Sequence, residues 1–519
     1  MSPISSTVLT GGLVADGLGG DPFLGDVLVA DGRVSAVVPA RERPAGGYDA
    51  EIVDCTDRVV APGFVDLHCH SDLSLLAYPG NESRVGQGVT TEVVGNCGMS
   101  PAPGNADAAG LARVISTIDV TPDLGWTWTD VAGWLQALDD CETATNVAAQ
   151  VGHGSARFAV TGTSTDPLDD DGLAALEREV EDAFAAGVVG VSLGLMYAPG
   201  ASAGADELAA VARIVAAHDG LLSAHLRDYR AGSLRRSIDE LAGASGEGGP
   251  RLQVSHLRGI GGQHGFPEAL AHLAALRESV DIDADAYPYV HGHTTLTQLL
   301  PPELRDGGPD AVVAACLTDP GAVARELAAA GYGLDQILVM KATETPEAVG
   351  SDLTEAPGDP WLWLVDLLVA NRGLVDVAAE SGRWSDIDLM LATDWVSIAS
   401  DGTALDRTHR ASVAHPRSWG AFSAGYRMLR HRGTAIGETV RRLSTAPAAR
   451  AGISSGIVPG RRADLVVLDD QAFDSAATFG DPARPSVGLD HVYVGGIAVV
   501  DSGRLTGARP GALIRGREQ

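Results

Sequence analysis

Short runs of alternating or apolar residues predict β-strands near both ends of the chain. Three runs before residue 40 are separated by Asp-Gly and Gly-Gly turns, and two runs of the same character lie near the C-terminus. Three strands alone cannot bury a core, so we expect both chain ends to build one small β-sandwich, residues 1–60 together with 447–519. The predicted strands are 7–14, 25–29, 33–38, 463–469 and 491–500.

The central part of the chain alternates between strand-like and helix-like segments. Residues 173–186 and 207–218 have helical periodicity, and a short apolar run follows each of them. Repeated strand–helix units imply a parallel sheet, and eight of them imply a closed barrel. The pattern therefore predicts an α/β fold with a TIM-like (β/α)8 barrel over residues 61–446. Its predicted strands are 61–70, 89–94, 146–151, 188–193, 221–225, 252–256, 280–285 and 395–399.

One long segment, residues of about 290 to 375, does not follow this alternation. It is partly helical, and it contains Pro301-Pro302. It comes just before the last predicted strand, and barrel enzymes carry their active sites at the C-terminal ends of the strands. We therefore expect an inserted lid subdomain that covers the site and moves when substrate binds.

Histidine, cysteine and aspartate residues follow several of the predicted barrel strands. His68 and His70 alternate with apolar residues, so a strand would present both imidazoles from one face. Each of these residues alone has a simple explanation in packing, but their shared position at strand ends predicts a metal site. Imidazole, thiolate and carboxylate ligands together suit zinc. The candidate ligands are His68, His70, Cys97, His225, His256 and Asp401.

Composition and charge restrict the partners. The net charge of −31 disfavours binding to nucleic acid or to anionic membranes, and the sequence contains no apolar run long enough to cross a bilayer. The five cysteines are unpatterned, which fits a reducing compartment. The first residues do not form a secretory signal. We expect a cytoplasmic protein, a monomer or a homodimer, that acts on a small molecule.

Motifs along nearly the whole chain resemble those of the amidohydrolase superfamily, and within it the N-acyl-D-amino-acid deacylases, or D-aminoacylases. The motifs occur in the order found in the family, and the segment 457–465 resembles the superfamily's return to its sandwich. The resemblance implies a zinc-dependent hydrolase that cleaves the amide bond of a small-molecule substrate with a carboxylate, an N-acyl-D-amino acid or a similar carboxylate-bearing amide. The matching segments are 62–70, 95–98, 151–154, 194–200, 224–228, 254–257, 285–289, 400–402 and 415–420.

The resemblance also implies roles for the metal ligands. Cys97, His225 and His256 would hold one tight zinc ion, and His68, His70 and Asp401 would surround a second, weaker position. Many relatives bridge two metals with a carbamylated lysine from the fourth strand. The sole lysine here, Lys341, follows His256 in the sequence and falls in the insertion, so we expect Cys97 to take the bridging or ligand role. Asp401 would be the catalytic residue that carries the proton from the attacking water to the leaving nitrogen.

Four further residues are expected to bind the substrate. Arg417 and Tyr287 match family residues that hold the substrate carboxylate, and a planar guanidinium suits a bidentate contact of this kind. The chain departs from the family at His293, where relatives commonly have a serine, and at Arg258, where a lysine is common. These departures leave the metal ligands untouched and concern the identity of the substrate.

Other functions remain open from the sequence. One is hydrolysis of a cyclic amide, as in dihydroorotase or hydantoinase, and a specialised biosynthetic amide hydrolase is a related possibility. The absence of a lysine from the fourth strand counts against the cyclic-amide reaction. A non-catalytic homologue is a third alternative, but such proteins typically lose metal ligands, and all six candidates are present here.

Overall fold

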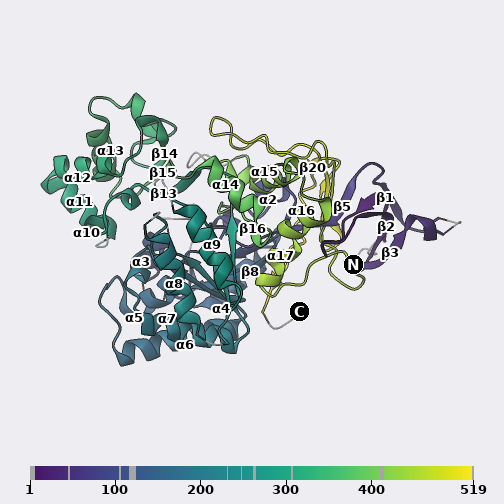
Figure 1. Ribbon diagram of the computed structural model, residues 1–519, viewed down its shortest axis with the longest axis horizontal. Helices are drawn as coiled ribbons and strands as arrows, with labels where there is room; N and C mark the ends of the chain where they lie inside the picture. Colours follow the sequence, from purple (N-terminus) through teal and green to yellow (C-terminus); the bar gives the residue numbers. More distant parts are fainter. Residues whose placement is uncertain are drawn as a thin grey trace.

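The computed structural model describes residues 6–44, 47–104, 107–115, 124, 126–230, 232–246, 248–260, 265–305, 308–408 and 414–516. Figure 1 shows three regions: a central barrel, a strand-rich region at the end where the N-terminus lies, and a lobe of helices and strands that projects from the opposite end. Within the described residues, no helix is long and apolar enough to cross a bilayer.

The central region is a parallel barrel of eight strands, which confirms the predicted α/β fold class. Its strands are neighbours in chain order from β6 to β12, and β16 follows β12. The first and last strands, β6 and β16, are connected through the segments that follow them. The Asp401 amide donates to the His68 carbonyl (2.8 Å), and the His70 amide donates to the Gly402 carbonyl (2.7 Å). The strands are β6 (Phe64–Asp66), β7 (Val89–Val94), β8 (Asn146–Gly152), β9 (Gly190–Gly194), β10 (Leu221–His225), β11 (Arg251–Val254), β12 (Ile282–Ala286) and β16 (Val396–Ile398).

Helices surround the barrel because each carries an apolar stripe that packs against the strands. Short helices follow β6 and longer ones follow most later strands, as expected for repeated strand–helix units. These helices are α1 (Ser74–Ala77), α2 (Glu82–Val85), α3 (Ala108–Ile115), α4 (Val131–Asp140), α5 (His153–Thr161), α6 (Asp170–Ala186), α7 (Ala205–Ala217), α8 (Leu234–Ser245), α9 (Phe266–Leu276), α14 (Trp384–Ala392), α15 (Arg417–His431), α16 (Ile436–Leu443) and α17 (Thr445–Arg450).

The predicted first barrel strand, 61–70, is wrong in its extent. The segment forms two strands, because β5 (Val59–Pro62) pairs in the terminal sheet while β6 pairs in the barrel. Gly63 separates them where the backbone passes close to Thr90, whose hydroxyl oxygen would lie 2.1 Å from a Cβ at this position. His68 and His70 therefore lie beyond the strand, and a strand's alternation cannot explain their shared orientation.

Strands from both chain ends form one nine-stranded mixed sheet, as the predicted fold class requires. The predicted strand 491–500 is in fact a hairpin, because Gly495 and Gly496 both adopt positive φ angles (54° and 75°) and turn the chain. Besides β5, the strands are β1 (Thr7–Val14), β2 (Phe23–Ala30), β3 (Arg33–Pro39), β4 (Glu51–Asp54), β17 (Leu465–Leu468), β18 (Leu489–Val494), β19 (Ile497–Asp501) and β20 (Arg504–Leu505), whereas β21 (Leu513–Ile514) pairs with β8 of the barrel. The predicted boundaries of this domain stay a prediction.

The insertion between β12 and β16 has its own apolar core, separate from that of the barrel. Its antiparallel sheet has the order β13-β15-β14 and runs to Glu380, a few residues past the predicted end of the segment. Figure 1 shows it as the projecting lobe. Its elements are β13 (His291–Thr295), α10 (Pro302–Arg305), α11 (Gly308–Thr318), α12 (Pro320–Ala329), β14 (Ile337–Ala342), α13 (Pro360–Ala370) and β15 (Val375–Glu380).

A buried ionic cluster connects the start of the barrel to helix α15. The guanidinium of Arg84, on α2, lies 2.9 Å from a carboxylate oxygen of Glu92 and 3.6 Å from one of Asp66. Arg84 also donates to the carbonyl of Ser418 (2.9 Å), and Asp66 accepts from the backbone amide of Ser400 (3.0 Å). All three charged side chains are inaccessible to solvent, so each charge depends on the others for stabilisation.

We predict that Arg84→Met destabilises the protein by about 3–5 kcal/mol, because it leaves two buried carboxylates without their cation. The free energy of unfolding from urea titration measures the loss. The control is Arg213→Met, which removes an ion pair with Glu177 whose arginine side chain is 67% exposed and should change stability by less than about 1 kcal/mol. Equal effects of the two substitutions would contradict the prediction.

Candidate active site

Two overlapping groups of buried side chains at the strand ends could each hold a metal ion. The first is His68, Cys97 and His256, and the second is His68, His70 and Asp401. The ligand atoms within each group lie within 4.8 Å of one another. The Cys97 sulfur is 3.4 Å from the Nε2 atoms of both His68 and His256, and an Asp401 oxygen is 3.0 Å from Nε2 of His70. The fold thus brings together residues that are over 330 positions apart in the sequence.

Three of these residues have left-handed backbone conformations. The φ angles are 53° for Cys97, 34° for His256 and 50° for Asp401. Residues other than glycine, asparagine and aspartate rarely adopt such angles, so the backbone is strained at Cys97 and His256, at a typical cost of about 1–3 kcal/mol each. Strain of this kind persists where the surrounding structure enforces it, and it is common in active sites.

The turn that carries Cys97 requires glycine on both sides. Gly95 and Gly98 have positive φ angles of 81° and 75°. A Cβ on Gly95 would lie 2.0 Å from the Gln150 carbonyl oxygen, and one on Gly98 would lie 2.3 Å from the Gly194 amide nitrogen. The loop after β7 therefore packs directly on the backbone of β8 and β9, which fixes the position of the thiol.

His225, the sixth predicted ligand, lies beside the first group. Its ring is 4.6 Å from the His256 ring, in an edge-to-face arrangement, and its Nε2 atom is 3.4 Å from the Met196 sulfur. It belongs to neither of the two groups of close ligand atoms among the described residues. The structure thus places five of the six predicted ligands in these groups and the sixth next to them, and the division into a tight and a weak site stays a prediction.

The charges in this cluster favour ionised ligands. Burial acts to raise the pKa of the Cys97 thiol, but the neighbouring His68 and His256 outweigh burial and hold that pKa well below its usual range. Burial likewise acts to raise the pKa of Asp401, and Arg417 and His256 reverse the effect and lower it. A thiolate and a carboxylate among imidazoles are the donors that a divalent cation requires.

Asp285, which the motif analysis did not assign to the site, lies behind the ligands. One of its oxygens is 3.3 Å from Nδ1 of His68 and accepts a hydrogen bond from the His256 amide (2.7 Å). The other accepts from the Gln253 side chain (3.0 Å). A carboxylate behind a histidine fixes the ring and leaves the opposite nitrogen for a metal. Its position at the end of a predicted barrel strand was a signal that could have identified it.

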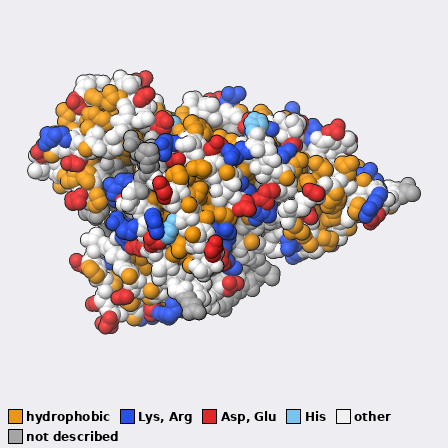
Figure 2. Space-filling view, viewed as in Figure 1, with side chains coloured by type: hydrophobic (Ala, Val, Ile, Leu, Met, Phe, Trp, Pro, Cys, Tyr) orange, Lys and Arg blue, Asp and Glu red, His pale blue; other side chains and the backbone are white. Residues whose placement is uncertain are grey.

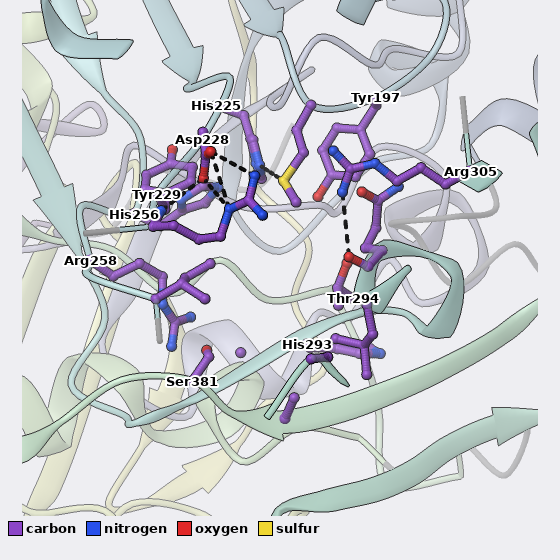
Figure 3. A pocket seen from close by; sticks show the side chains of 18 of the residues that line it. Tyr197, His225, Asp228, Tyr229, His256, Arg258, His293, Thr294, Arg305 and Ser381 are labelled. Atoms are coloured by element: carbon purple, nitrogen blue, oxygen red, sulfur yellow. Dashed lines mark hydrogen bonds and ion pairs between the residues drawn. The ribbon is translucent and has the colours of Figure 1, made fainter. Parts of the chain in front are cut away.

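A cavity of about 370 Å³ opens next to the ligand cluster. It is lined by His70, Cys97, His225, His256 and Asp401, and also by the four predicted substrate-binding residues Arg258, Tyr287, His293 and Arg417. Figure 3 shows His225 and His256 on one side, His293 and Thr294 of the insertion on another, and Arg258 beside Ser381. The described structure therefore gathers all these predicted residues around one space, with His68 directly behind it.

Two arginines approach the ring of Tyr287. The guanidinium carbons of Arg417 and Arg258 lie 4.8 Å and 5.2 Å from its centre. Arg417 also forms an ion pair with Asp401 (2.7 Å), which the sequence did not predict. Arg258 donates to the Tyr287 hydroxyl and to the Val290 carbonyl (3.0 Å), so its polar partners are neutral.

His293 extends from β13 of the insertion into the cavity. Its Nε2 atom lies 4.0 Å from a carboxylate oxygen of Asp376. Burial and the nearby Arg417 lower the pKa of His293 to about 3, so the ring is neutral at physiological pH.

Lys341, the sole lysine, lies on β14 of the insertion sheet and not on the fourth barrel strand, which ends in Gly194. The expectation that lysine provides no metal bridge therefore agrees with its position.

Comparisons with known proteins show that the chain is similar to members of one enzyme family over nearly its whole length. Residues 51–300 match the model of the Amidohydrolase family. The chain is 30% identical to the N-acyl-D-glutamate deacylase of Alcaligenes xylosoxydans xylosoxydans, over 98% of this chain and 96% of that protein, and 30% identical to the D-aminoacylase of the same organism, over 98% and 97%.

A solved structure provides a further match. It is that of N-acyl-D-glutamate deacylase from Bordetella bronchiseptica, complexed with zinc and with a phosphonate inhibitor that mimics the tetrahedral intermediate of the reaction. It is 28% identical and superposes with a TM-score of 0.81, over 99% of this chain and 100% of that one. The similarity thus covers the barrel, the terminal sheet and the insertion together.

We predict that Asp285→Asn lowers zinc affinity by about 10- to 100-fold, because the amide keeps the size of the side chain but loses the charge that orients His68. Competition with a chromogenic chelator measures the dissociation constant. Asp283→Asn is the matched control, since Asp283 lies on the same strand but pairs with Arg277. An unchanged zinc affinity for Asp285→Asn would show that this carboxylate does not support the metal site.

Proposed function

The chain belongs to the amidohydrolase family, and we propose that it is a zinc-dependent hydrolase that removes the acyl group from N-acyl-D-amino acids. One observation carries the proposal: the buried thiolate and imidazole cluster opens onto a cavity whose lining also presents the guanidinium groups of Arg258 and Arg417. A metal centre beside a carboxylate-binding wall fits a substrate that has an amide bond close to a carboxylate. The names of the relatives support the same reaction.

The donor set fits zinc. The Nε2 atoms of His68 and His256 face the Cys97 sulfur at 3.4 Å, and Nε2 of His70 faces an Asp401 oxygen at 3.0 Å, so buried nitrogen, sulfur and carboxylate donors converge. We propose that His68, Cys97 and His256 hold one ion with His225, and that His68, His70 and Asp401 form a second, weaker position. Zinc, when bound, lowers the pKa of a bound water to about 7 and so supplies a nucleophile at neutral pH.

Asp401 is the residue that we propose to move the proton. Its carboxylate lies in the cavity wall, 3.0 Å from His70 and 2.7 Å from Arg417. Burial acts to raise the pKa of Asp401, but Arg417 and His256 lower it and keep the carboxylate ionised, which is the form that can accept a proton from the attacking water. It then delivers this proton to the amide nitrogen, which cannot leave as an anion. Arg417 holds the carboxylate in place during both transfers.

We propose that the wall around Tyr287 binds the α-carboxylate of the substrate. Arg258 has a planar guanidinium with neutral partners, so it can offer N–H donors to an anion without breaking an ion pair. Arg417 contributes positive charge from the other approach to the ring. His293, neutral at physiological pH, can donate or accept one hydrogen bond at the same wall. These contacts would orient the amide bond toward the metal ligands.

We predict that Cys97→Ala loses bound zinc and that its activity falls by at least about a hundredfold, more than the loss of a supporting residue would cause. Elemental analysis and a deacylation assay on the same preparation provide the two measurements. Cys316→Ala is the control, because Cys316 is equally buried but lies in the core of the insertion. Full zinc content in Cys97→Ala would remove the thiolate from the proposed site.

We also predict that Arg258→Gln lowers kcat/KM for an N-acyl-D-amino acid, by an amount that corresponds to about 2–5 kcal/mol of lost transition-state stabilisation, because the substrate carboxylate loses its charged partner. The corresponding primary amide lacks that charge, so wild type and variant should hydrolyse it equally poorly. Arg230→Gln is the control: Arg230 lines the same cavity, but its side chain is 66% exposed and already pairs with Asp228. If wild type cleaved acid and amide at equal rates, the carboxylate site would be refuted.

A further inference from the structure

Tyr229 is a buried tyrosine that lies against two of the proposed zinc ligands. Its ring centre is 5.1 Å from that of His225, in an edge-to-face arrangement, and 5.2 Å from that of His256. Figure 2 shows Lys or Arg side chains gathered on this face where the projecting lobe meets the barrel. Arg230 lines the cavity with a side chain that is 66% exposed, whereas Tyr229, which lines the same cavity, is 2% exposed. Tyr229 therefore lies on the buried side of the cavity, beside the ligands.

The hydroxyl of Tyr229 joins the two turns that carry these histidines. It accepts a hydrogen bond from the amide of Leu226, the residue after His225 (3.0 Å). It donates one to the carbonyl of Ser255, the residue before His256 (2.9 Å). A tyrosine hydroxyl has one hydrogen to donate, and here the Ser255 carbonyl takes it. The hydroxyl is thus committed to the backbone of both turns and not to a substrate in the cavity.

Backbone contacts connect the same two segments on either side of this hydroxyl. The Ser255 amide donates to the Ala224 carbonyl (3.0 Å), and the Ile260 amide donates to the Tyr229 carbonyl (3.0 Å). Arg230 and Ile260 form an isolated parallel bridge beyond the ends of β10 and β11. The hydroxyl of Tyr229 therefore adds a side-chain connection where the two imidazoles project from the backbone.

The imidazole of His225 needs support from its surroundings. Among the described residues, it belongs to neither group of close ligand atoms, and its Nε2 atom faces the Met196 sulfur at 3.4 Å. The rings of Tyr197 and Tyr229 lie against it, with centres 4.7 Å and 5.1 Å away. Figure 3 shows Tyr229 next to His256 on one side of His225 and Tyr197 on the other side. A smaller residue at position 229 would give the imidazole room to turn away from a bound ion.

We propose that Tyr229 is a positioning residue for the metal centre. Its hydroxyl fixes the separation of the turns that carry His225 and His256, and its ring restricts the orientation of both imidazoles. A ligand that is already held in its binding orientation loses less freedom when the ion binds, so the affinity for the ion is higher. This inference rests on the proposed function, because it concerns the zinc ion that the first ligand group would hold together with His225.

Two substitutions separate the hydroxyl from the ring. Tyr229→Phe removes the two hydrogen bonds and keeps the ring, whereas Tyr229→Leu removes both. The zinc dissociation constant, measured by competition with a chromogenic chelator, should rise about tenfold for Tyr229→Phe and about a hundredfold for Tyr229→Leu, the range typical of residues that support metal ligands. The visible spectrum of the cobalt-substituted protein should change as well, because its bands depend on the number and geometry of the ligands.

Tyr426→Phe is the matched control. Tyr426 is also buried, and its hydroxyl donates to a carboxylate oxygen of Asp470 (2.7 Å). It lies on α15, where its ring contacts that of Phe473 (5.3 Å between centres). The substitution therefore removes a buried hydroxyl and leaves the turns of His225 and His256 unchanged, so zinc affinity and the cobalt spectrum should stay as in wild type. Circular dichroism and thermal unfolding of the metal-free proteins check the fold and stability of each variant.

Each result supports or overturns the inference. Weaker zinc binding in both Tyr229 variants, with wild-type affinity in Tyr426→Phe, supports it. Wild-type affinity in either folded Tyr229 variant, or an equal loss of affinity in Tyr426→Phe, would overturn it and leave the proposed deacylase activity intact. Tyr229→Phe removes only an oxygen atom, so it decides the question alone if Tyr229→Leu does not fold. A wild-type protein that binds zinc but hydrolyses no N-acyl-D-amino acid would instead refute the proposed reaction, and the zinc measurements would still decide the role of Tyr229.

Discussion

The contact of one buried cysteine with two imidazoles is the constraint on which the site depends. The Cys97 sulfur is 3.4 Å from both His68 and His256, and these three residues come from loops after three different barrel strands. Polar groups so close together and so deeply buried are costly without a shared partner. A metal cation is that partner, because it satisfies the thiolate and the imidazoles together. The left-handed backbone at Cys97 and His256 is part of the same cost, and the packing of Gly95 and Gly98 enforces it at the cysteine.

Three sets of contacts in the surrounding structure hold this cluster in position. Asp285 holds His68 and the His256 amide from behind, so the ligand nitrogens point forward. The backbone contacts between the segments after β6 and β16 bring Asp401 beside His68. The buried cluster around Arg84 connects the same strand region to α15, the helix that begins with Arg417. The same contacts therefore close the barrel and position the Asp401 carboxylate beside the histidines.

Much of this arrangement could be predicted from the sequence, because barrel topology places strand ends together. All eight barrel strands had recognisable apolar or alternating segments, and the candidate ligands lie at the C-terminal ends of five of them, β6, β7, β10, β11 and β16. The periodicity failed at His68 and His70, since the strand ends at Asp66 and a tertiary contact at Gly63 decides where it begins. The Arg417–Asp401 pair was not predictable, because both residues had other assigned roles and only their folded positions reveal the contact. The hairpin at Gly495-Gly496 had a turn signal, but the apolar run through it concealed the break.

The most direct test of this account is the dependence of deacylation on zinc. Amine release from a set of N-acetyl-D-amino acids and their L-enantiomers would be measured on the zinc-loaded protein, on the same protein after chelation, and after zinc is returned. The account predicts hydrolysis of D-substrates that disappears with the metal and recovers when zinc is restored, because the proposed nucleophile is a water molecule that needs the metal to ionise at neutral pH. Metal-free protein that hydrolyses these substrates as fast as the zinc-loaded form would contradict it.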